Sequence, residues 1–163
     1  AAAANVGKPT IYARFGSKAG LLKAVVDHVL THRLVPIDRA IVAQTAVEAL
    51  KEQLANVIAA SIDPAFLDLF RLYLNEGRRF PRIFEAFSPQ ASTHPLLVEQ
   101  MDRYAEFAGL RVTKDEAAST MLSMAGMVVT MAAAQDGDRA AISPAREASR
   151  IVDVCLYGLL ERG

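Results

Sequence analysis

An all-α fold is predicted by three features of this 163-residue sequence. Apolar residues recur at helical spacing in most segments, and capping residues stand at the start of several of them. No run of alternating apolar and polar residues competes as a strand. Because 52% of the residues are hydrophobic, the chain can bury the core of one main domain with a small appendage.

The first helix is expected to be short and to follow a turn. Asn5 and Gly7 are turn residues, and Pro9 suits the first turn of a helix, where its missing N–H has no partner to lose. Gly16 ends this helix, and Ser17 is placed to cap the next one. Lysine, threonine, tyrosine and arginine side chains are spread around this first helix, which favours contact with phosphate.

Six further helices are expected after Gly16, together with a short helix over residues 81–87. Their predicted ranges are 17–35, 45–62, 64–79, 95–108, 113–134 and 143–161. Pro36 should end the first of them, and Thr113 with Glu116 forms a capping box for the fifth. Residues 88–95 are predicted to form a loop because they contain two prolines and several hydroxyls, and residues 135–142 form a polar connection.

The segment from residue 6 to residue 21 carries a specific motif. It reads Val-Gly-Lys-Pro-Thr-Ile-Tyr-Ala-Arg-Phe-Gly-Ser-Lys-Ala-Gly-Leu and combines about ten restricted positions over one turn and two helix starts. This motif resembles the turn and recognition helix of the tetracycline-repressor (TetR) family of transcriptional regulators. The resemblance covers about the first thirty residues, while the rest agrees with the family by its helical pattern alone.

The resemblance implies DNA contacts from seven residues. Base-edge or phosphate contacts are implied for Lys8, Pro9, Thr10 and Ala13, and phosphate contacts for Tyr12, Arg14 and Lys18. A complete helix-turn-helix also needs a first helix and a whole second helix, so about 35 residues of the domain are expected to precede residue 1. The 163 residues alone are therefore not expected to bind an operator well.

The resemblance divides the chain into two parts. Residues 1–35 are interpreted as the C-terminal part of a helix-turn-helix DNA-binding domain with a connecting helix, and residues 36–163 as a helical ligand-binding and dimerisation domain. The distribution of charged residues along the chain agrees with this division. Five basic side chains against Asp27 give residues 1–35 a net charge of +4, and the whole chain is neutral, so the remainder carries −4.

The last two helices predict a homodimer. Met121–Ala134 contains no charged residue, and Ile151–Leu160 contains only Asp153. A helix that is apolar on every side must be covered on every side, so we expect a second copy to supply part of the cover. The TetR family pairs its last two helices in this way. The alternative is a monomer whose earlier helices wrap these two completely.

Aromatic and methionine residues in the middle helices form the candidate ligand pocket. Such stripes are most often ordinary core, but the resemblance implies a small-molecule effector between these helices. Gly77, one turn beyond Tyr73, is expected to leave space for it. The predicted effector is apolar or aromatic, with Asn56, Ser61, Tyr73 or Tyr104 as polar contacts. The candidate lining residues are Phe66, Phe70, Tyr73, Gly77, Tyr104, Phe107, Met124 and Met127.

Metal, redox and catalytic chemistry find little support in the sequence. His28 and His32 have the spacing of a metal-binding pair but lack a third ligand nearby, so a polar seam between the two parts of the chain is the preferred interpretation. The single cysteine, Cys155, stands among apolar residues and is expected to be a buried, inert thiol of a reducing cytoplasm. No catalytic motif, no cofactor motif, no secretory signal and no run of 18 apolar residues are present.

The sequence therefore predicts a cytoplasmic, ligand-responsive transcriptional regulator. Its expected partners are a double-stranded DNA operator, a small-molecule effector and a second copy of the chain, with no membrane and no cofactor. Repression released by the effector is the expected mode of action, through a change in the spacing of the two recognition helices. The alternative is a helical small-molecule binding protein with no operator, and an enzyme on a helical bundle is the third class considered.

Overall fold

The fold was analysed in a computed structural model, which describes residues 7–32, 40–85, 87, 89–110, 112–134 and 142–159. The side chains of Lys8 and of residues 89–92 and 157–159 lie outside the description. The predicted turn at Asn5, the helix end at Pro36 and the connection over residues 135–141 also fall on segments that are not described.

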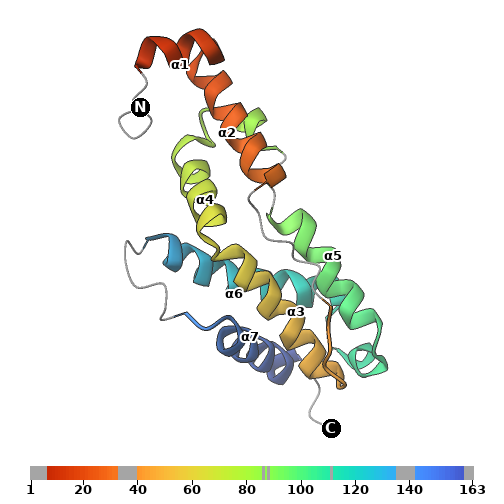
Figure 1. Cartoon of the computed structure of the whole chain (residues 1–163). Coiled ribbons are helices and arrows are strands. Elements are labelled where there is room, and N and C mark those ends of the chain that lie inside the picture. Colours follow the sequence, from red (N-terminus) through yellow and green to blue (C-terminus); the bar gives the residue numbers. More distant parts are fainter. Residues whose placement is uncertain are drawn as a thin grey trace.

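The described part of the chain is all-α, as predicted, and contains no strand (Figure 1). Its helices are α1 (Lys8–Phe15), α2 (Lys18–His32), α3 (Ala46–Ser61), α4 (Pro64–Glu76), α5 (Pro89–Asp102), α6 (Lys114–Ala134) and α7 (Pro144–Leu159). Along the chain, α5 is preceded by the short 3₁₀ helix η1 (Pro81–Ile83) and followed by a second one, η2 (Ala105–Gly109). In Figure 1, α1 and α2 project from one end of the body that the other helices form.

Helix ends follow the capping residues that the sequence supplies. The Thr45 hydroxyl accepts a hydrogen bond from the Glu48 N–H, and the Asp63 carboxylate accepts one from the Ala65 N–H. The capping box that opens α6 is confirmed, because the Glu116 N–H donates to the Thr113 hydroxyl and the Thr113 N–H donates to the Glu116 carboxylate.

The helix predicted over residues 95–108 is displaced toward the N-terminus. It begins at Pro89 and ends at Asp102, so the loop expected over 88–95 is largely helical and Pro95 lies inside α5. Pro95 is the seventh residue of α5, so it lacks the backbone N–H of a helix interior and its ring crowds the carbonyl group four residues earlier, yet the helix continues through it. Residues 105–108 belong instead to η2, and the short helix expected over 81–87 is the three-residue η1.

Two apolar clusters hold the helices together. The larger lies between α3, α5, α6 and α7, with Leu54, Met101 and Met121 fully buried in it. The smaller joins Leu22 and Val26 of α2 to α4, to Phe84 and Phe87, and to the C-terminal end of α6. Because this second cluster contains residues of both parts of the chain, helix α2 is packed directly against the body.

Candidate functional site

Helix α1 presents an exposed polar face. Gly7, in an extended conformation, precedes the helix, and Pro9 occupies its first turn. Of the residues for which DNA contacts are predicted, Pro9, Thr10, Tyr12, Ala13 and Arg14 are exposed. Half of the Tyr12 surface is accessible, although tyrosine is a large and partly apolar residue. Such a surface can meet the phosphates and base edges of a DNA groove.

The turn between α1 and α2 depends on two glycines. Gly16 has a φ of 73°, in the left-handed region that favours glycine. The Ser17 hydroxyl accepts a hydrogen bond from the Gly20 N–H at 3.0 Å, which confirms the predicted cap of α2. A Cβ atom on Gly20 would lie 2.1 Å from the Phe15 carbonyl oxygen. Only glycine therefore permits this approach of α2 to the end of α1, a requirement that sequence reasoning missed.

Lys18, a predicted phosphate contact, lies against the body of the protein. Its ammonium group pairs with the Glu76 carboxylate at 2.5 Å and stands 5.9 Å from the centroid of the Phe80 ring. About half of the Lys18 side chain is exposed, against 22% of the Glu76 side chain. Phosphate contact by Lys18 would have to compete with this ion pair. The pair joins the first turn of α2 to the last turn of α4.

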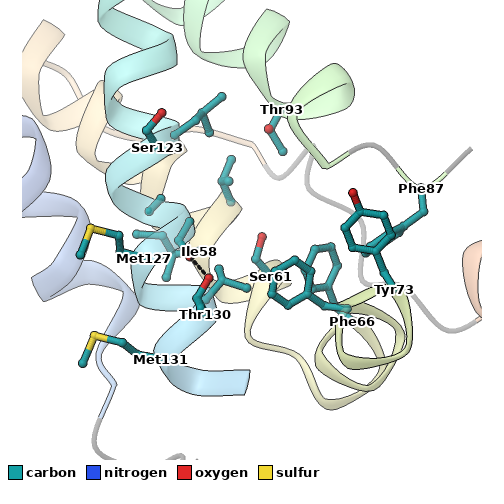
Figure 2. Close-up of a pocket in the computed structure, with 16 residues that line it drawn as sticks. Ile58, Ser61, Phe66, Tyr73, Phe87, Thr93, Ser123, Met127, Thr130 and Met131 are labelled. Carbon is teal, nitrogen blue, oxygen red and sulfur yellow. Dashed lines mark hydrogen bonds between the residues drawn. The ribbon is translucent and has the colours of Figure 1, made fainter. Parts of the chain in front are cut away.

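A cavity of about 660 Å³ opens between α3, α4, α5 and α6 (Figure 2). Four aromatic rings form one wall: Phe66, Phe70 and Tyr73 of α4 together with Phe87. The end of α3 contributes Val57, Ile58 and Ser61, and α5 contributes Thr93. Helix α6 supplies the opposite wall with Leu122, Ser123, Ala125, Gly126, Met127, Val129, Thr130 and Met131. The volume is that of a site for a drug-sized molecule.

The predicted ligand residues divide into two groups. Phe66, Phe70, Tyr73 and Met127 border the cavity. In Figure 2, however, Met127 points from α6 away from the aromatic rings, so it lies at the rim. The other predicted residues do not border the cavity: Gly77, Tyr104, Phe107 and Met124. Of these, Phe107 is buried in the larger apolar cluster, against which Tyr104 and Met124 pack.

A protein family and solved structures are similar to this chain. Residues 1–25 match the family described as bacterial regulatory proteins, tetR family. The fold is similar to the crystal structure of a putative TetR-family transcriptional regulator from Mesorhizobium loti MAFF303099. The TM-score is 0.62 at 18% sequence identity, over 97% of this chain and 83% of that one. No match is found among curated proteins.

The two matches support a TetR-family transcriptional regulator. The match over residues 1–25 agrees with the predicted family, and the structural match confirms the helical architecture. Together the two similarities support the class of DNA-binding regulators that form homodimers.

One expectation for the ligand site is wrong. Gly77 does not leave space for a ligand, because a Cβ atom there would lie 2.6 Å from the Tyr73 carbonyl oxygen and 2.9 Å from the Tyr73 ring. The Gly77 N–H donates to the same carbonyl oxygen at 2.7 Å, which closes the end of α4. Gly77 thus accommodates the tyrosine ring, and the open space lies on the side of the rings that faces α6.

Helix α6 has a long exposed face without a charge. Eight exposed residues at helical spacing form this α6 outer face: Ser119, Thr120, Ser123, Gly126, Met127, Thr130, Met131 and Ala134. Met127 is 68% exposed and Met131 is 58% exposed. Among the described helices, α6 is also long and apolar enough to cross a membrane by length and composition alone. Its opposite face is buried against α3, α5 and α7 of the same chain.

Helix α7 contributes less exposed apolar surface than predicted. Ile151, Val152, Cys155 and Leu156 are buried in the larger cluster of the chain itself, whereas Val154 is 56% exposed. The described part of α7 therefore covers the body with most of its apolar residues. The uncharged surface that remains open belongs mainly to α6.

The thiol and imidazole groups form no site among the described residues. Cys155 is buried with its Sγ 3.7 Å from the Met124 Sδ, and burial raises the pKa of the thiol, as expected for an inert cysteine. The His28 and His32 rings stand 5.2 Å apart, and both residues are exposed. No group of three metal-ligating side chains occurs in the described ranges.

Proposed function

We propose that this chain acts as a ligand-responsive, DNA-binding repressor, as a homodimer in the cytoplasm. In this proposal the exposed face of α1 reads the operator, the cavity binds the effector, and the α6 outer face meets a second copy. The family match and the fold support the DNA-binding class. The proposed role is that of a regulator and not of an enzyme.

One observation carries the proposal: helix α4 contacts both the cavity and the DNA-binding part. Phe66, Phe70 and Tyr73 border the cavity on one face of α4. At the end of the same helix, Glu76 pairs with Lys18 of α2. Leu67 and Leu69 of α4 are buried in the cluster that also contains Leu22 and Val26 of α2. A ligand that displaces α4 would therefore displace α2 and, through the close approach of Gly20 to the end of α1, also α1.

The mechanism follows from this shared helix. In a dimer, two recognition helices must match two half-sites on one DNA molecule. An effector that binds better to a different position of α4 would shift the population toward an arrangement that no longer matches both half-sites. DNA affinity would fall without any change in the residues that contact DNA.

The α6 outer face is proposed as the dimer interface because it carries no charge and exposes two large methionines. Uncharged helix faces pair through isologous contacts in symmetric dimers. The cavity opens beside this face, since Ser123, Gly126, Met127, Thr130 and Met131 belong to both. A second copy would thus lie close to the mouth of the cavity.

Replacement of Glu76 tests the link through α4. An operator is first selected from a random double-stranded DNA library by its binding to the natural-length protein. Glu76→Gln removes the carboxylate that holds Lys18, so operator affinity should rise by up to about fivefold, the equivalent of an exposed ion pair. Glu99→Gln removes the carboxylate of another exposed ion pair, with Arg103 of the turn after α5, and should leave operator affinity unchanged.

Equal operator affinities for the wild type, Glu76→Gln and Glu99→Gln would contradict the proposed link. Failure of the library to yield any enriched site would instead favour the alternative, a helical small-molecule binding protein without an operator. The sign of regulation is tested with a reporter gene placed behind the selected site. A repressor should lower expression of the reporter, and the effector should restore it.

A further inference from the structure

The lining of the cavity, as far as the structure describes it, is uncharged. None of the sixteen residues that border it carries a charge at neutral pH, and its polar groups are the hydroxyls of Ser61, Tyr73, Thr93, Ser123 and Thr130. An ionised ligand group buried here would lose its hydration without gaining an opposite charge. The cavity should therefore discriminate against carboxylates, sulfonates, phosphates and ammonium groups.

Its aromatic wall is suited to flat rings. The Phe66 and Phe87 ring centroids are 5.4 Å apart, and Tyr73 stands 5.8 Å from Phe87 with its ring at a steep angle to it. Phe66 and Phe70 are more nearly parallel, with centroids 6.3 Å apart. The wall thus offers both faces and edges, which are the two surfaces that aromatic ligands prefer to contact.

One buried residue that borders the cavity has a hydroxyl without a partner among the described residues. Ser61, the last residue of α3, is 7% exposed, and no hydrogen bond to its hydroxyl occurs in the described part of the chain. Figure 2 places it between the aromatic wall and α6. A serine hydroxyl can donate one hydrogen bond and accept others, so a ligand oxygen could satisfy it.

The two α6 hydroxyls in the cavity differ from that of Ser61 because each already donates its hydrogen to a backbone carbonyl oxygen of α6. The Ser123 hydroxyl donates to the Ser119 carbonyl oxygen and the Thr130 hydroxyl to the Gly126 carbonyl oxygen, each at 2.8 Å. Toward a ligand these two oxygens can only accept. Of these three hydroxyls, that of Ser61 is therefore the one free to donate to a ligand acceptor such as a ketone or ether oxygen.

We infer that the effector is an uncharged aromatic compound with an oxygen acceptor, held with its rings against Phe66, Phe70, Tyr73 and Phe87 and its oxygen at Ser61. This inference rests on the proposed function and narrows its ligand to one chemical class. It concerns the cavity alone, so it can be tested without DNA.

The first test compares two fluorescent probes that share one skeleton. N-phenyl-1-naphthylamine is neutral, and 8-anilino-1-naphthalenesulfonate adds a sulfonate to the same rings. The neutral probe should bind at least tenfold more tightly. Equal or tighter binding of the sulfonate, or no binding of the neutral probe, would overturn the inference.

A blocked cavity shows where the neutral probe binds. Gly126 borders the cavity, and no atom lies within 4 Å of a Cβ placed on it, so Gly126→Phe can enter the space without a backbone clash. This variant should weaken binding of N-phenyl-1-naphthylamine at least tenfold, whereas Gly109→Phe, in equally open space but away from the cavity, should not. Equal affinities of the two variants would place the probe elsewhere and refute the site.

The second test isolates the Ser61 hydroxyl. Benzophenone and diphenylmethane both carry two phenyl rings, but only benzophenone has a carbonyl oxygen. Ser61→Ala should weaken benzophenone binding about fivefold, as for one lost hydrogen bond, and should leave diphenylmethane within twofold. An equal change for both compounds, or none for either, would remove Ser61 from the ligand contact.

These outcomes separate the ligand class from the proposed function. If both probe pairs behave as expected but benzophenone leaves operator affinity unchanged, the ligand class stands and ligand-responsive regulation fails. If the sulfonate binds as well as the neutral probe while operator affinity still responds to ligand, the regulation stands and the ligand class fails.

Discussion

The glycine at position 20 allows the sharpest perturbation of the DNA-binding part. Gly20→Ala adds one methyl group at a point 2.1 Å from the Phe15 carbonyl oxygen, whereas ordinary contact begins at 3.4 Å. The two helices must therefore separate locally by about 1.3 Å. Because the contact lies at the turn between α1 and α2, this separation changes the direction in which α1 projects.

The expected effects are a small loss of stability and a larger loss of operator affinity. Overpacking costs about 1–3 kcal/mol, and alanine recovers about 1 kcal/mol through its higher helix propensity, so the net loss should be about 0–2 kcal/mol. A misplaced α1 loses base contacts that are worth about 1–3 kcal/mol each. Operator affinity should therefore fall at least tenfold, with a smaller change in binding to non-specific DNA.

The assay measures operator affinity and urea unfolding for the natural-length protein. Gly109→Ala is the matched control, since a Cβ at Gly109 meets no atom within 4 Å. The control should retain wild-type operator affinity. If Gly20→Ala also retains wild-type affinity and stability, the close approach at the turn does not set the position of α1 and the reasoning fails.

Three further predictions concern the charge, the assembly and the pH dependence of the protein. Lys18→Ala should reduce the salt dependence of operator binding by about one unit per subunit, measured as the slope of log affinity against log salt, and an unchanged slope would exclude Lys18 from the interface. Thr120→Glu, on the α6 outer face, should weaken the dimer in sedimentation at micromolar concentration, whereas Ala108→Glu, exposed on η2, should not; equal dimer affinities would place the interface elsewhere. Hydrogen bonds from Thr113 lower the pKa of Glu116 in the folded chain, so its contribution to stability is present near neutrality and is lost as the pH falls through the acidic range. The difference in unfolding free energy between the wild type and Glu116→Gln should accordingly shrink on acidification, and a difference that is constant with pH would refute the linkage.

The sequence predicts the parts of the fold that depend on local signals. Caps at Ser17, Thr45, Asp63 and Thr113 mark helix starts because their side chains bond to backbone groups within three residues. The sequence predicts the start of α5 too late because Pro89 and Pro95 indicate a loop, whereas in the structure Pro89 opens the helix and Pro95 lies inside it.

The candidate site was harder to predict because it depends on which face of each helix meets a neighbour. Phe66, Phe70 and Tyr73 were found from their shared face, and the structure places them on one wall of the cavity. Gly77 lies on that face too, but the Tyr73 ring fills the space beside it, which spacing cannot reveal. The close approach at Gly20 likewise depends on a contact between two helices that no local pattern marks.

The most direct test of the whole account is the affinity of the natural-length protein for its selected operator, measured with and without benzophenone. Fluorescence competition with N-phenyl-1-naphthylamine would establish in the same samples that the cavity is occupied. The account predicts that saturating ligand lowers the operator affinity of the wild type at least tenfold. Gly126→Phe, whose filled cavity and altered α6 outer face can lower its operator affinity before ligand is added, should show no further fall. An operator affinity that stays constant while the wild-type cavity fills with ligand would contradict the account.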